Sequence, residues 1–196
     1  MRKWLLGLVA MLLFVACDDG VQKAYWDNGK LKSELRYEDG KLNGECVWYD
    51  QNGALSAMGS YKDDVLDGVY TRWHPNGKVA SEEHYVDGKL DGEVKKWYDN
   101  GQLFQEGQYV DGMMDGQWFI FYPSGALAGK ADYKMGTGKQ ICYEESGYKC
   151  LEVPYVNNLK HGREIYYNPD GMITKLVDYE QGKVVAENDH PTNGEE

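Results

Sequence analysis

Apolar and polar residues alternate along most of this chain, in fixed positions relative to seven regularly spaced glycines. An aromatic residue stands four positions before each of these glycines and a tyrosine stands eight positions after each. An aliphatic residue follows two positions after all of them but one. Because these offsets are all even, extended strands would bring the three residues to one face of a sheet, opposite charged residues such as Lys32 and Glu34. This period predicts β-strands, and the intervals between turns are too short for ordinary helices.

The glycines themselves indicate an internal repeat. They are separated by 24 residues, with one interval of 22, and comprise Gly29, Gly53, Gly77, Gly101, Gly125, Gly147 and Gly171. Most follow Asn or Asp, which are turn-forming residues. Eleven positions later a second set of turn residues occurs: Gly40, Asp64, Gly88, Gly112, Gly136, Asn158 and Gly182. We therefore predict an all-β fold, an elongated single-layer antiparallel meander of about seven 24-residue β-hairpin repeats.

The N-terminus has a different character from the repeats. The stretch "MRKWLLGLVAMLLFVAC" has a basic start and an apolar run too short to span a bilayer comfortably as a helix, which predicts a secretory signal. Its end resembles the lipobox of bacterial lipoproteins, which implies a diacylated Cys17; an ordinary signal with an unmodified cysteine is the alternative. The predicted domains are a signal peptide at 1–16, a tether at 17–24, the repeat domain at 25–183 and a disordered acidic tail at 184–196.

The repeat unit resembles a known family. The stretch "NGQLFQEGQYVDGMMDGQWFIFYPSG" is similar to the bacterial variant of the MORN repeat, found in YwqK-type antitoxin proteins. The resemblance implies a twisted sheet of hairpins without a catalytic centre, and the antitoxin label implies a protein that binds another protein. Because the signal fits a cytosolic immunity role poorly, we favour a lipid-anchored module of the bacterial cell envelope, on its periplasmic or surface side.

Charge and residue spacing restrict the function further. The net charge of −11 makes nucleic acid and anionic lipid headgroups poor partners, so the expected contact with a membrane is through lipid. Neighbouring carboxylates such as Glu82 and Glu83 point to opposite faces of a strand and cannot share a substrate. The histidines lack metal-ligand spacing and the cysteines form no CxxC motif. We predict a protein that is not an enzyme and has no catalytic, metal or cofactor site.

The aromatic positions form the candidate binding surface. They either pack among themselves as the core of a one-layer sheet or present an apolar face to a partner. The candidate aromatic face comprises Tyr61, Trp73, Tyr85, Trp97, Tyr109, Phe121 and Tyr133. Two functions are open. The first is an interaction module for an unknown protein partner, of which an antitoxin-like role is one form; the second is a structural envelope scaffold that associates with itself.

A disulfide is predicted in the shortened repeat. If the aromatic residue before each glycine opposes the aliphatic residue after it, the same register places Cys142 directly opposite Cys150. An exported protein would meet an oxidising environment, so the pair would form a disulfide and Cys46 would remain a free thiol. Two reduced cysteines in strand positions are the alternative.

Overall fold

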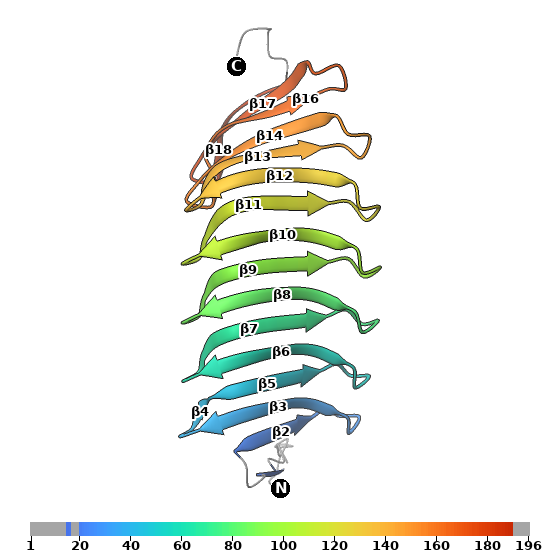
Figure 1. Cartoon of the computed structure of the whole chain (residues 1–196), viewed down its shortest axis with the longest axis vertical. Coiled ribbons are helices and arrows are strands. Elements are labelled where there is room, and N and C mark those ends of the chain that lie inside the picture. The colour runs from blue at the N-terminus through green and yellow to red at the C-terminus, as the bar shows by residue number, and fades with distance from the viewer. Residues whose placement is uncertain (1–14, 17–19, 190–196) are drawn as a thin grey trace, which may run out of the picture.

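The computed structural model describes residues 15–16 and 20–189, and all regular elements in this part of the chain are β-strands. They form one antiparallel sheet of 18 strands (Figure 1). The predicted all-β meander is therefore confirmed. The strands are β1 (Val15–Ala16), β2 (Val21–Tyr25), β3 (Leu31–Glu38), β4 (Lys41–Leu42), β5 (Gly44–Tyr49), β6 (Leu55–Lys62), β7 (Val65–Trp73), β8 (Val79–Val86), β9 (Lys89–Trp97), β10 (Leu103–Val110), β11 (Met113–Phe121), β12 (Leu127–Lys134), β13 (Thr137–Tyr143), β14 (Lys149–Val156), β15 (Leu159–Lys160), β16 (Gly162–Tyr167), β17 (Ile173–Glu180) and β18 (Lys183–Asn188).

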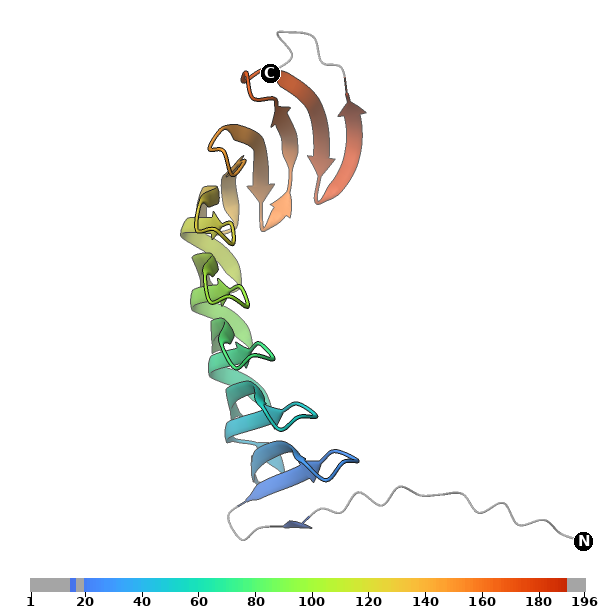
Figure 2. The same ribbon diagram turned by 90° about the vertical axis from the view of Figure 1, so that its right-hand side faces the viewer.

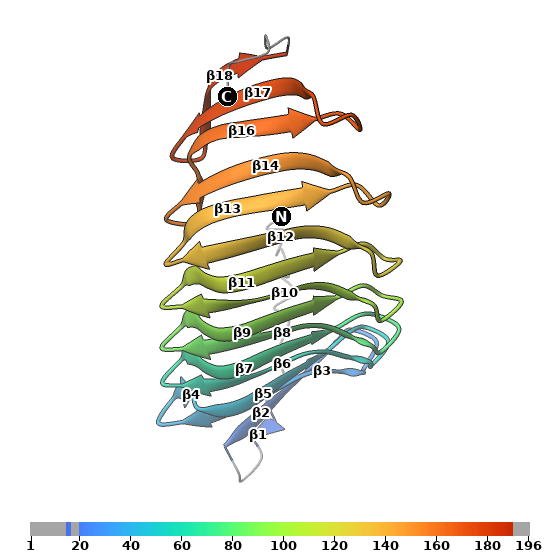
Figure 3. The same cartoon turned by 45° about the horizontal axis from the view of Figure 1, so that its top comes forward.

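Each strand pairs with its neighbours along the sequence, so the strands lie across the sheet in the order of the chain (Figure 1). The strands are curved, and the sheet twists toward its C-terminal end, where β14 to β18 turn away from the plane of the earlier strands (Figure 2). The tilted view shows the long loops at one end of the strands, along one side of the sheet, and the tight turns at the other end (Figure 3). Twist of this kind is the normal consequence of the right-handed preference of each strand.

Two kinds of turn alternate between the strands. The tight turns, at the second set of predicted positions, place both central residues at positive φ, as in Asp111 (48°) and Gly112 (78°). This is the type I′ geometry that suits two-residue hairpins. The loops at the 24-residue glycines are longer: the Gly53 amide donates to the Asp50 carbonyl, and the Asp50 amide donates to the Ala54 carbonyl.

A β-bulge follows each of these long loops. In all seven hairpins the register shifts between the residues four and five positions before the glycine. Trp73, for example, pairs with Val79, but Arg72 pairs with Ser81, which leaves Ala80 as the extra residue. The pairing predicted across each long loop is therefore correct for the first residue pair, such as Trp73 with Val79, and wrong for the pairs beyond the bulge. Because a bulge inserts one residue into one strand, it breaks the alternation of faces on which the predicted aromatic surface depended.

Hydrogen bonds join the turns of successive repeats along both edges. At the long loops the first loop side chain donates to a main-chain carbonyl of the next repeat, at Trp26, His74, Tyr98 and Tyr122. At the tight turns the amides of Gly88, Gly112 and Gly182 donate to carbonyls 22 residues earlier. Each repeat is thus held by its immediate neighbours, as expected for a repeat protein.

Both ends of the predicted repeat domain need correction. Residues 21–24, expected in a tether, belong to β2, and β2 pairs with β1 through Val15 and Ala16. Residues 184–188, expected in a disordered tail, belong to the exposed strand β18, which pairs with β17. Val184 and Val185 are β-branched residues that favour an extended strand, so the acidic end of the tail did not represent this segment. Cys17, residues 1–14 and residues 190–196 lie outside the described part of the chain.

Candidate functional site

One face of the sheet, here called the tyrosine face, holds the core of the protein. Tyr109 and Trp118 meet edge to face with ring centroids 5.0 Å apart, and Trp118 also contacts Tyr133 at 6.4 Å. Trp118 is only 3% exposed although the sheet has a single layer. Such burial requires the curved strands to curl around this face. The predicted Tyr61, Tyr85, Tyr109 and Tyr133 lie here and pack against the preceding or following repeat.

Two buried carboxylates interrupt this core, and both have partners. Glu83 accepts hydrogen bonds from Arg72 Nη2 at 3.0 Å and from the Tyr85 hydroxyl at 2.9 Å. Burial, reinforced by the hydrogen bond to Glu83, raises the pKa of Tyr85 to about 12. Glu164, 1% exposed, accepts from Lys160 Nζ at 2.7 Å and from the Tyr166 hydroxyl at 3.0 Å. Each of these two carboxylates is therefore already paired with one cation and one tyrosine hydroxyl.

The remaining predicted aromatic residues do not lie on the tyrosine face. Arg72 lies over the ring of Tyr70 on the tyrosine face, so strand alternation places the adjacent Trp73 on the opposite face. The same register shift applies to Trp97 and Phe121. The prediction of a single aromatic face is therefore wrong, because the bulge separates the residues before each glycine from the tyrosines after it.

The cysteine register is corrected for the same reason. Cys142 pairs with Leu151 and Tyr143 pairs with Lys149, so Cys150 is the bulged residue and does not oppose Cys142. Cys46, Cys142 and Cys150 are free thiols in the structure. Burial raises the pKa of each of these thiols, which disfavours the reactive thiolate. The argument for a disulfide therefore has no support in the strand register.

Exposed apolar side chains follow the tight-turn edge of the opposite face. Val65 is 41% exposed and its Cγ1 lies over the next tight turn, 3.1 Å from where a Cβ would stand at Gly88. Val86 is 50% exposed and lies one repeat further along. We call the whole set the turn-edge stripe; its members are Val65, Val69, Val86, Met135, Val156 and Leu159. Lys41 and Lys89 pair with Asp63 and Asp111 along the same edge, so the stripe has a charged rim.

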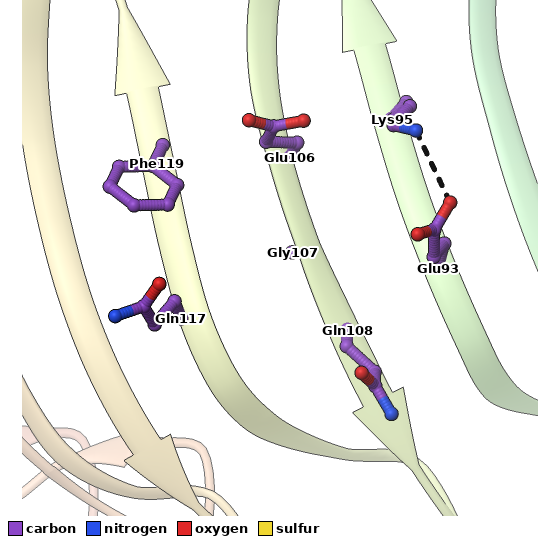
Figure 4. Close-up of a pocket in the computed structure, with 7 residues that line it drawn as sticks. All are labelled: Glu93, Lys95, Glu106, Gly107, Gln108, Gln117 and Phe119. Atoms are coloured by element: carbon purple, nitrogen blue, oxygen red, sulfur yellow. Dashed lines mark hydrogen bonds and ion pairs between the residues drawn. The ribbon is translucent and has the colours of Figure 1, made fainter.

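Two shallow hollows flank Phe119 on the same opposite face. One, of about 320 Å³, extends from Phe119 over Gly107 to Glu93 and Lys95 (Figure 4). The other, of about 300 Å³, extends to Lys130, Asp132 and Lys139. Figure 4 shows Phe119 and Gln117 on one strand beside Glu106 and Gln108 on the next. Sequence reasoning missed Phe119 because the residue type at its position varies between repeats. The equivalent residues are Val47, Thr71 and Lys95.

Within the part of the chain that the structure describes, no group of three His, Cys, Asp or Glu residues is arranged to hold a metal ion. The same residues include no helix with the length and apolar character needed to cross a bilayer.

Comparison with known proteins identifies the class of repeat. The model of the MORN repeat variant matches five consecutive segments, at residues 18–39, 42–63, 66–87, 90–111 and 114–135. These segments cover more than half of the sequence, so the chain belongs to the MORN repeat variant family. The match has the same periodicity as the hairpins of the sheet.

Other comparisons add little. A search of curated proteins found no match to this sequence. Among solved structures, a chain in the "Crystal structure of GtfA/B complex bound to UDP and GlcNAc" is similar at 14% identity, with a TM-score of 0.28. The similarity covers 62% of this chain and 24% of that one, so this chain spans about a quarter of its length. A likeness at this level carries no argument about function.

Proposed function

We propose that this protein is a lipid-anchored interaction module of the bacterial cell envelope that binds a protein partner through the turn-edge stripe. The supporting observation is the row of exposed apolar side chains with a charged rim, a composition typical of a protein–protein interface. The tyrosine face is less suitable, because its aromatic rings are already packed against each other. Membership in a repeat family fits a binding role, since such scaffolds present extended surfaces.

The proposal assigns no catalysis to the protein. The buried carboxylates Glu83 and Glu164 are each occupied by a cation and a tyrosine hydroxyl, which supports a structural role for them. An antitoxin or immunity function would be one form of the proposed binding role, in which the partner is a toxin. Self-association into an envelope scaffold through the same stripe is the competing function.

Site-specific photo-crosslinking in intact cells separates these functions. A photoreactive phenylalanine analogue at Val86 should give one discrete adduct with a different protein, whose mass identifies the partner. The same analogue at Met172, which is 54% exposed in a long loop, is the matched control and should give no such adduct. An adduct of twice the chain mass at Val86 would favour the scaffold. Equal labelling at both positions, or none at Val86, contradicts the proposed surface.

The proposed anchor rests on the N-terminal sequence and is tested at Cys17. Cleavage before this residue would also remove β1, so that β2 would become the edge of the mature sheet. Two acyl chains at about 0.8 kcal/mol per buried methylene give stable membrane attachment. Cys17→Ala should release the protein from the membrane fraction or leave an unprocessed precursor. A processed Cys17→Ala protein that stays in the membrane fraction would exclude lipid anchoring.

A further inference from the structure

The surface around Phe119 differs in chemistry from the turn-edge stripe. Its centre is an aromatic ring, and Phe119 stacks with Phe121 at a centroid distance of 6.4 Å and an interplanar angle of 27°. Around it stand Glu106, Gln108 and Gln117, whose side chains have no hydrogen-bond partner among the described residues. An aromatic platform beside planar amide and carboxylate groups can stack on the C–H face of a sugar while hydrogen-bonding its hydroxyls.

The charges of this surface indicate a neutral ligand. Three carboxylates and three amines line the two hollows: Glu93, Glu106, Asp132, Lys95, Lys130 and Lys139. Lys95 already pairs with Glu93 at 3.2 Å, and Lys139 pairs with Glu152 at 2.9 Å. Because the two signs balance within the site, neither a polyanion nor a polycation gains much attraction there.

The repeat indicates that the ligand is extended. The aromatic residue four positions before each glycine recurs on this face in every second strand, at Trp73, Trp97, Phe121 and Tyr143. Since neighbouring strands lie about 4.8 Å apart, equivalent residues are separated by about 10 Å. This is close to the length of one disaccharide unit in an extended β-1,4-linked glycan, so successive aromatic residues can contact equivalent sugars.

We propose that this face binds a neutral, extended β-1,4-linked polysaccharide, with sugar rings stacked on Phe119 and Phe121 and the chain running along the long axis of the sheet. This inference does not depend on the protein-binding role of the turn-edge stripe. Exposed amide and carboxylate groups at the hollows supply hydrogen bonds to the sugar hydroxyls. The spacing of the aromatic residues along the sheet matches the disaccharide repeat of the polysaccharide.

The test uses the full-length protein in detergent with four probes of known composition. These are the hexasaccharides and disaccharides of β-1,4-linked glucose and of β-1,4-linked N-acetylglucosamine, which distinguish a plain from an amino-sugar glycan. At least one hexasaccharide should bind, at least about tenfold more tightly than its disaccharide because it spans more than one repeat. The affinity should be unchanged between low and high salt, since the contacts are not charge-dependent.

Variants locate the site. Phe119→Ala should weaken binding of the hexasaccharide by about tenfold or more, whereas Phe119→Trp should retain it. Tyr148→Ala, at an aromatic residue in a long loop away from the hollows, is the control and should bind like wild type. If circular dichroism shows that Phe119→Ala has unfolded, Gln117→Ala at an exposed position replaces it. The proposal is overturned if neither hexasaccharide binds, if salt abolishes binding, or if the folded variant binds normally.

Discussion

Gly107 lies beneath the most buried aromatic ring of the sheet, and its replacement tests how the tyrosine face is packed. A Cβ atom added at Gly107 would stand 2.1 Å from Cδ2 and 2.4 Å from Cε2 of Trp118. Since real carbon atoms do not approach this closely, Gly107→Ala must displace the ring or the strand. Trp118 is 3% exposed, so it has little free space into which to move.

The expected cost lies between two limits. Overpacking of a core usually costs about 1–3 kcal/mol, and complete loss of a buried Trp costs about 3–5 kcal/mol. Replacing Gly by Ala in a strand recovers about 0.5–1 kcal/mol of backbone entropy. We expect Gly107→Ala to lower the free energy of unfolding by about 2–4 kcal/mol.

Gly129 provides the matched control on the same face. It is buried in β12, and a Cβ there would meet its nearest atom, the Ile141 carbonyl oxygen, at 3.4 Å. Neither Gly107 nor Gly129 has positive φ, so backbone conformation does not distinguish them. Gly129→Ala should change the unfolding free energy by less than about 1 kcal/mol.

Urea unfolding followed by circular dichroism and tryptophan fluorescence measures these values, with coincident transitions as the check on two-state behaviour. A double-mutant cycle with Trp118→Leu adds a specific test, because removing the indole should abolish most of the cost of Gly107→Ala. The packing argument fails if Gly107→Ala is as stable as wild type, if Gly129→Ala is equally destabilised, or if the two substitutions at Gly107 and Trp118 are simply additive.

Three further predictions concern stability. Met135→Asn should raise the unfolding free energy by about 0.5–1 kcal/mol in a urea titration, because Met135 has φ 47° at a tight turn and asparagine adopts this conformation more readily; an unchanged or lower value would contradict this. Tyr109→Ala should cost about 3 kcal/mol or more and Tyr179→Ala clearly less, since Tyr109 packs on Trp118 between repeats whereas Tyr179 is near the end of the sheet; equal losses would argue against nearest-neighbour stabilisation. The hydrogen bond from Lys149 lowers the pKa of Glu152, so this carboxylate contributes stability above its unfolded pKa of about 4.3 and loses it as the pH falls through the lower folded value. Glu152→Gln should therefore lose less stability than wild type between pH 7 and pH 3, and identical losses would refute the assignment.

The sequence alone was sufficient to predict the strands, the turns and the order of the sheet. Strand alternation and turn chemistry are local properties, repeated here seven times in phase, so residues such as Gly112 could be assigned to turns before the structure was known. The tyrosines after each glycine were also correctly placed on one face, because they occupy equivalent positions in successive repeats. The register shifts beside several of them, as between Glu83 and Tyr85, do not change this.

Only the tertiary structure decided which residues share a face across the long loops. A bulge adds a single residue on one side of a hairpin, and a pattern of period two carries no mark of where that residue is inserted. Such insertions place Trp73 on the face opposite Tyr85 and leave Cys150 out of register with Cys142. The strand β18 was missed for a different reason: the tail was judged by its acidic end, although Val184 and Val185 favour an extended strand. Its pairing with β17 satisfies the main-chain hydrogen-bonding groups of both strands, which is the physical reason that the sheet extends to Asn188.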